Sequence, residues 1–223
     1  MVYGLGNKSR DYLKQEFGDA IPHLNWSDKN QSVGRIFLEH ALMVSDAMVA
    51  IELACRERGD VRLITDKDLR AESEDKLVSA SFHWTAKLHG GRTLGVIPDK
   101  VFALERTDHG ASNRAFFFLE ADRGTMPVIR RNLSQTSFYR KLLAYEATWT
   151  QAVHKTRFGF HRFRVVTLTT SAERVGSLVG ACSQLERGHG LFLFTDLGSI
   201  QKPSDIFSPV WTTGRGEPGS LLN

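Results

Sequence analysis

The segment Arg114-Ala-Phe-Phe-Phe-Leu-Glu-Ala-Asp122 starts as an apolar, aromatic run and ends in two acids. Runs of this length and composition, followed by a turn such as Arg123-Gly-Thr125, are typical of β-strands. Side chains alternate between the two faces of a strand, so Glu120 and Asp122 are expected on the same face. The segment therefore predicts a strand that presents two carboxylates at its end.

Further strands and helices are predicted on both sides of this strand. Strand-like runs occupy residues 62–65, 81–87, 96–105, 163–169 and 191–195. Helices are predicted at residues 33–58, which Gly59 terminates, at 134–155, and after Ser171, which can cap a helix that has Glu173 in its first turn. A charged helix or loop is expected at residues 66–76. This order predicts an α/β fold in which helices flank a mixed central sheet on both faces.

The domain organisation follows from the same pattern. Residues 1–21 are expected to hold a short strand, a glycine turn and a helix, and the polar residues 22–32 read as a connector. The core is predicted at residues 33–197. The last segment, 198–223, is rich in Gly, Pro and Ser and is predicted to be an extended tail with Trp211 as its anchor.

Composition excludes several classes of protein. The chain has 223 residues, of which 41% are hydrophobic and 24% charged, so it is not a disordered chain, a collagen or a coiled coil. Its longest apolar stretches fall far short of the roughly 20 residues that a membrane span needs. The start of the chain lacks the apolar core of a signal peptide. Two isolated cysteines, Cys55 and Cys182, indicate a reduced, cytoplasmic protein without a zinc site.

Positive charge is concentrated in one part of the chain. Between Arg123 and Arg164 there are nine arginine and lysine residues and one glutamate, a net +8, whereas the whole chain has a net charge of +4. A positive segment of this kind attracts polyanions such as DNA through phosphate contacts and counterion release. The alternative is a solvated basic face that binds nothing.

Three acids are predicted to meet at one corner of the sheet. Asp99 follows Pro98 at the opening of one strand, and Glu120 and Asp122 end the next. If the two strands form an antiparallel hairpin, Asp99 lies beside Glu120, and a cation would relieve the repulsion between them. Oxygen ligands suit Mg²⁺ or Mn²⁺. The alternative is that Asp99 only starts a turn and Asp122 only caps a loop.

The predicted helix that follows adds polar groups to this corner. Lys141 and Tyr145 are four residues apart and share a face, so Lys141 could orient a metal-bound water and Tyr145 could contact a phosphate. A lysine and a tyrosine at this spacing are more often surface and core residues. The arginines expected to position the phosphate backbone are Arg123, Arg130, Arg131, Arg140 and Arg157.

Taken together, these motifs resemble the replication-relaxation family of plasmids and other mobile elements. The resemblance is carried by Glu120-Ala-Asp-Arg-Gly-Thr125, Lys141-xxx-Tyr145, Pro98-Asp99 and Phe163–Thr169, and it covers residues 2 to 197. It implies a restriction-endonuclease-like core of the PD-(D/E)xK group, with residues 1–21 as the remnant of a winged-helix module. It also implies that Asp99 and Glu120 are the ligands of the Mg²⁺ or Mn²⁺ ion. Asp122 stands where the group has its catalytic lysine, and Lys141 is the candidate replacement.

Several functions are compatible with this resemblance. The first is metal-dependent nicking or cleavage of DNA in plasmid replication or transfer, carried by Asp99, Glu120, Asp122, Lys141 and Tyr145. A relaxase-like variant would use Tyr145 or Tyr139 as a nucleophile. The second is a catalytically inactive protein that binds DNA or docks onto a replication or mobilisation partner. The third is a nuclease subunit that works only within a defence or toxin complex.

Overall fold

A computed structural model describes residues 35–72, 82–88, 90–108 and 111–222 of the chain. The chain divides into two compact units, residues 1–42 and residues 43–223. The predicted winged-helix remnant at residues 1–21 lies outside the described residues. The long helix α3 (Arg35–Arg58) belongs to the second unit from Met43 onward.

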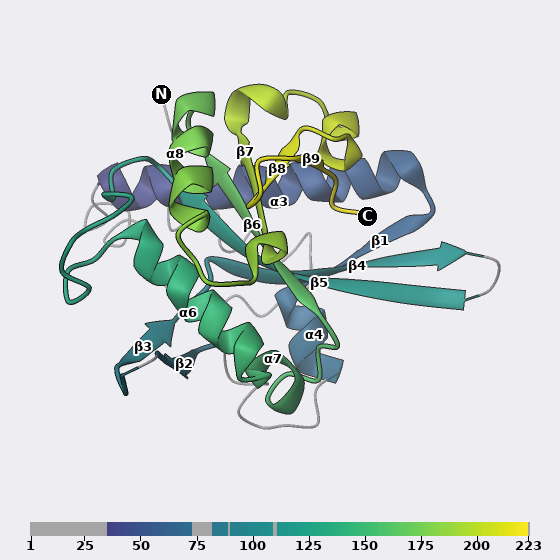
Figure 1. Cartoon of the computed structure of the whole chain (residues 1–223). Helices are drawn as coiled ribbons and strands as arrows, with labels where there is room; N and C mark the ends of the chain where they lie inside the picture. The colour runs from purple at the N-terminus through teal and green to yellow at the C-terminus, as the bar shows by residue number, and fades with distance from the viewer. Residues whose placement is uncertain (1–34, 73–81, 89, 109–110, 223) are drawn as a thin grey trace, which may run out of the picture. The chain divides into compact units, whose positions relative to one another are not determined.

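A seven-stranded mixed sheet is the centre of the second unit (Figure 1). Its strands, in spatial order, are β1 (Val61–Ile64), β4 (Lys100–Asp108), β5 (Ala111–Asp122), β6 (Phe163–Thr169), β7 (Phe192–Asp196), β8 (Trp211–Thr213) and β9 (Pro218–Gly219). β5, β6 and β7 are mutually parallel, and the remaining pairs are antiparallel. A separate antiparallel hairpin consists of β2 (Trp84–Lys87) and β3 (Thr93–Val96).

Helices and short helical turns connect these strands. They are α4 (Asp66–Glu72), α6 (Phe138–Thr150), α7 (Val153–Thr156), α8 (Ala172–Cys182) and the 3-10 turns η1 (His189–Leu191), η2 (Leu197–Ser199) and η3 (Pro203–Phe207). None of the helices within the described ranges has an apolar stretch that could cross a lipid bilayer.

Both faces of the sheet are covered, as the sequence predicts. On one face, α6, α8 and the β2–β3 hairpin pack their apolar side chains against Phe118, Val165 and Phe194. On the other face, α3 from Met43 onward and the C-terminal segment cover Phe117 and its apolar neighbours. Figure 1 shows α6 and α8 on the near side of the sheet and α3 behind it. The predicted α/β class with a mixed, flanked sheet is confirmed.

Two predicted elements differ from the structure. The run 96–105 was predicted as one strand, but β3 ends at Val96 and β4 starts at Lys100 and continues to Asp108. The helix predicted over 134–155 is shorter at its start and breaks after Thr150, where Ala152 adopts a left-handed conformation with a φ of 54°. Apolar residues stand on both sides of each break, so the prediction joined elements that the backbone separates.

The C-terminal segment 198–223, predicted as an extended tail, adds two strands to the sheet. Trp211 is buried in β8 and its indole N–H donates to the carbonyl of Ile206 at 2.9 Å, so its predicted role as an anchor is confirmed. Ser171 caps α8 as predicted, because its hydroxyl accepts a hydrogen bond from the backbone N–H of Arg174 at 3.2 Å.

Candidate functional site

The face of the sheet that packs under α6 changes from apolar to polar along β5 and β6. Phe118 is followed on the same face of β5 by Glu120 and Asp122, and these two residues pair in register with Thr167 and Thr169 of β6. The polar side chains therefore lie at the carboxyl ends of parallel strands. Open α/β sheets bind ligands outside this end of their strands.

Asp99 reaches this end of the sheet from the neighbouring strand. Lys100 pairs with Leu119, so Asp99 stands across from Glu120 just before β4 begins. The backbone N–H of Asp99 donates to the carbonyl of Leu119 at 3.0 Å, and its carboxylate accepts from the N–H of Ala121 at 2.8 Å. The predicted proximity of Asp99 and Glu120 is confirmed.

Two side chains of α6 hold the carboxylate of Glu120. Lys141 donates from its ammonium group to Oε2, and the hydroxyl of Tyr145 donates to Oε1 at 2.6 Å. The Glu120 side chain is only 2% exposed, whereas that of Lys141 is 34% exposed. The predicted shared face of Lys141 and Tyr145 thus points at Glu120. We call Asp99, Glu120, Lys141 and Tyr145 the acid–lysine cluster.

Burial and neighbouring charges shift the pKa values of Glu120, Lys141 and Tyr145. Burial raises the pKa of Glu120, an effect that the charge of Asp99 reinforces and Lys141 opposes. Burial alone would lower the pKa of Lys141, but the carboxylates of Glu120, Asp99 and Asp122 outweigh it and raise that pKa. Burial also raises the pKa of Tyr145 well above its ordinary value, so its phenol keeps its proton. Lys141 is therefore a cation placed directly on a buried carboxylate.

The Asp122 side chain makes different contacts, although it shares the face of Glu120. Nε of Arg174 donates to Oδ2 at 2.7 Å, and the terminal guanidinium nitrogen reaches Oδ1 at 3.2 Å and the carbonyl of Met126 at 2.6 Å. The hydroxyl of Thr169 donates to the backbone carbonyl of Asp122 at 2.9 Å. Asp122 and Arg174 therefore tie the start of the 123–137 loop to α8, and we call them the loop clamp.

Most of the predicted phosphate-binding arginines gather around this loop. Backbone N–H groups of Phe138 and Tyr139 donate to the carbonyls of Pro127 and Val128, at 3.0 and 2.8 Å, so the loop folds back on the start of α6. Within the loop, the guanidinium of Arg130 donates to the carbonyl of Thr136 at 3.1 Å.

Arg140 also contacts the loop, through a 3.1 Å hydrogen bond to the carbonyl of Ser134. Arg157 lies apart from this group, beyond α7 at the other end of α6, a 13-residue helix whose length is about 20 Å. Arg92 is an addition that the sequence did not indicate. It comes from the end of the β2–β3 hairpin and lines a cavity of about 550 Å³ together with Arg131. Arg92, Arg123, Arg130, Arg131 and Arg140 form what we call the basic loop surface.

A second, smaller cavity of about 190 Å³ lies beside Asp99. Its lining includes Asp66, Arg70, His83 and Lys100 in addition to Asp99. Asp66 is paired with Arg70 at 3.0 Å. Asp99 lines this cavity, whereas the buried Glu120 is not among its described lining residues.

In the described arrangement, Lys141 neutralises Glu120 without a divalent cation. Both oxygens of Glu120 accept hydrogen bonds, from Lys141 and Tyr145, and the ammonium group occupies the place of a cation beside them. No group of three potential metal-ligating side chains occurs among the described residues. Each oxygen of Glu120 has a second lone pair, so these hydrogen bonds do not by themselves exclude a cation.

The two tyrosines considered as nucleophiles are both engaged. The hydroxyl of Tyr145 is buried against Glu120, and that of Tyr139 donates to the carbonyl of Gln184 at 3.2 Å. Burial raises the pKa of Tyr139 as well. Neither phenol is therefore poised as a phenolate.

The fold and site define a mixed α/β protein with an acid–lysine cluster at the carboxyl ends of its parallel strands, next to a basic loop. The model of the replication-relaxation family matches residues 1–162, and the chain belongs to this family. No curated protein and no solved structure matches the chain. The family places the protein in replication or the processing of mobile-element DNA.

Proposed function

We propose that the chain binds DNA during replication or relaxation of a mobile element, such as a plasmid, and holds the DNA backbone on the basic loop surface. The observation that carries this proposal is the gathering of five arginines from three parts of the chain around one loop. Guanidinium groups recognise phosphate in a bidentate manner and remain charged at every physiological pH. The loop clamp fixes this loop to the sheet.

A salt titration tests this proposal. The triple variant R130Q/R131Q/R140Q is expected to bind a labelled duplex at least about tenfold more weakly at about 0.1 M salt. The slope of log affinity against log salt should fall by about three, since three phosphate contacts are removed. Fluorescence anisotropy measures both quantities.

The matched control changes three exposed arginines on other elements, R56Q/R62Q/R215Q, and loses the same charge. It should retain most of the affinity and slope. Equal losses in both triple variants would contradict the proposal, because they would show that net charge, and not this surface, attracts DNA. Failure of the wild-type chain to bind any DNA would also contradict it.

Phosphodiester cleavage is the second candidate, and the adjacency of Asp99 and Glu120 favours it. In this reading the core is restriction-endonuclease-like and belongs to the PD-(D/E)xK group. Asp99 and Glu120 would hold Mg²⁺ or Mn²⁺, and Lys141 would replace the lysine that Asp122 displaces from the motif. The cavity beside Asp99 offers a path to the site. Each oxygen of Glu120 has a lone pair beyond its hydrogen bond to Lys141 or Tyr145, so the cation would bind beside these two side chains.

Supercoiled DNA separates the two candidates. If the protein cleaves, the wild-type chain with Mn²⁺ converts supercoiled to nicked or linear DNA, and D99N and E120Q each reduce this conversion at least about a hundredfold. Agarose gels report the products. If the protein binds DNA but does not convert it, only the DNA-binding function remains. If conversion survives both substitutions, the catalytic residues are not Asp99 and Glu120.

A further inference from the structure

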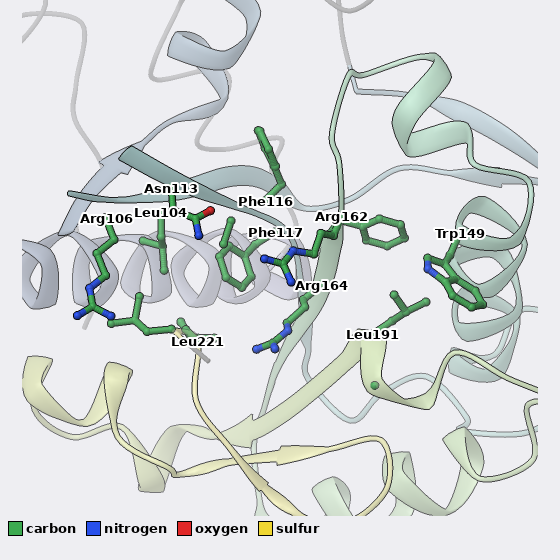
Figure 2. A pocket seen from close by; sticks show the side chains of 14 residues that line it. Leu104, Arg106, Asn113, Phe116, Phe117, Trp149, Arg162, Arg164, Leu191 and Leu221 are labelled. Carbon is green, nitrogen blue, oxygen red and sulfur yellow. The ribbon is translucent and has the colours of Figure 1, made fainter. Parts of the chain in front are cut away.

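A separate cavity lies at the other end of β5 from the acid–lysine cluster. β5 begins at Ala111, but its partner β6 begins only at Phe163, opposite Phe116. The first residues of β5 therefore extend past β6, and a cavity of about 400 Å³ occupies the corner. Asn113 on its rim is seven residues from Glu120, roughly 23 Å along the strand. We call this cavity the arginine pocket (Figure 2).

Three arginines from β4, β6 and the residue before β6 line this pocket, and none of its described lining residues is an aspartate or glutamate. Arg106 has a partner, because it lies 3.3 Å from Asp60. Arg162 and Arg164 form no ion pair with a carboxylate of the described residues. Arg164 is half-buried and donates to the carbonyl of Ser220 at 3.0 Å. Its burial and the charge of Arg162 lower the pKa of Arg164.

Unpaired charge in a half-buried position is costly, and a bound anion would remove the cost. The guanidinium groups of Arg162 and Arg164 extend to the same side of β6, toward Phe117 and Leu221 (Figure 2). They flank the same space from β6 and from the residue just before it, as a phosphate-binding pair requires.

The rest of the pocket is apolar with one polar edge. Buried side chains of Leu104, Phe117 and Leu221 form its floor, and the exposed side chain of Asn113 stands at the rim. A flat, largely apolar ligand that packs on these side chains would shield their apolar surface from water. An asparagine amide can both donate to and accept from the edge of a nucleobase. The volume is within the range of roughly 300–1,000 Å³ that small-molecule sites have.

We propose that the arginine pocket binds a nucleoside phosphate, with the phosphate on Arg162 and Arg164 and the base on the apolar floor beside Asn113. The ligand has one chemistry but two possible sources, a free nucleotide or the phosphorylated end of a DNA strand. The proposal does not depend on the basic loop surface, which lies around a different loop at the other end of β5.

Calorimetric titration of the full chain with dAMP tests this assignment. dAMP is expected to bind at least about tenfold more tightly than inorganic phosphate or adenosine, because it engages both parts of the pocket. R162Q and R164Q should each weaken dAMP binding at least about tenfold, while R56Q leaves it unchanged. Arg162 is exposed, so its substitution is not expected to disturb folding. The R130Q/R131Q/R140Q variant should bind dAMP as the wild type does.

Two short oligonucleotides, with a 5′-phosphate and with a 5′-hydroxyl, identify the source. A strand end is the ligand if the phosphorylated oligonucleotide binds more tightly than dAMP and R162Q removes the difference. A free nucleotide is the ligand if dAMP binds at least as tightly. Absence of dAMP binding, or binding that neither R162Q nor R164Q weakens, would overturn the proposal.

Discussion

Replacement of Lys141 by methionine is expected to lower the free energy of unfolding by about 3 kcal/mol at pH 8. The substitution leaves the Glu120 carboxylate buried without its cation, and the loss of one partner of a buried ion pair costs about that much. Tyr145 alone then donates to Glu120. Urea denaturation followed by circular dichroism measures the change.

The loss should depend on pH in a defined direction. In K141M the folded state keeps Glu120 buried, so the folded-state pKa of Glu120 lies above the unfolded value of about 4.3. The free energy of unfolding therefore falls as the pH rises from the unfolded pKa of Glu120 through its folded one. The destabilisation is therefore smaller at pH 5 than at pH 8. In the wild type, the pKa of Lys141 is raised in the folded state. Its contribution to the free energy of unfolding is therefore fully present below the unfolded pKa of about 10.4 and is lost as the pH rises through the folded pKa.

Two variants complete this experiment. K141M/E120Q is expected to recover most of the loss, because the amide carries no charge. K155M, at an exposed lysine of α7, should leave stability unchanged. If K141M were as stable as the wild type at pH 8, Lys141 would not neutralise Glu120 in solution.

Replacement of Arg174 by methionine is expected to cost about 3 kcal/mol and to loosen the 123–137 loop. Arg174 is 15% exposed and Asp122 4%, so the substitution strands a buried carboxylate and removes the donor to the carbonyl of Met126. Limited proteolysis should cut the loop faster in R174M than in the wild type. DNA affinity should fall as well, since the loop carries Arg130 and Arg131.

The exposed Arg215 provides the matched control, as R215M removes an arginine that has no such contacts among the described residues. It should change neither stability nor loop cleavage. R174M/D122N should regain part of the stability but not the protection of the loop, because the bond to Met126 stays absent. Unchanged cleavage of the loop in R174M would show that the loop is held by its contacts with α6 instead.

The core of the site could be predicted because it depends on local periodicity. Alternation along β5 placed Glu120 and Asp122 on one face of the strand, and the helical repeat placed Lys141 and Tyr145 on one face of α6. The hairpin of β4 and β5 is a local pairing, so Asp99 could be expected near Glu120.

Other parts of the site depend on contacts between segments far apart in the chain. Arg174 is 52 residues from Asp122, and no spacing rule links them. Arg92 meets Arg131 only because the β2–β3 hairpin packs beside the loop. In the same way, the separation of Arg157 from the other arginines follows from the length and direction of α6.

The amino-acid order alone therefore determined the α/β class and the face on which the acids lie, since these follow from repeats of two and 3.6 residues. It also determined that residues 123–164 are basic, since that is a matter of composition. Tertiary structure decided what each charge faces. It placed Lys141 on Glu120 and Arg174 on Asp122, and it brought Arg162 and Arg164 together in a pocket whose described lining has no acid. Partner choice is set by the packing of helices and strands across the sheet, and the energy of a charge depends on that partner and on burial.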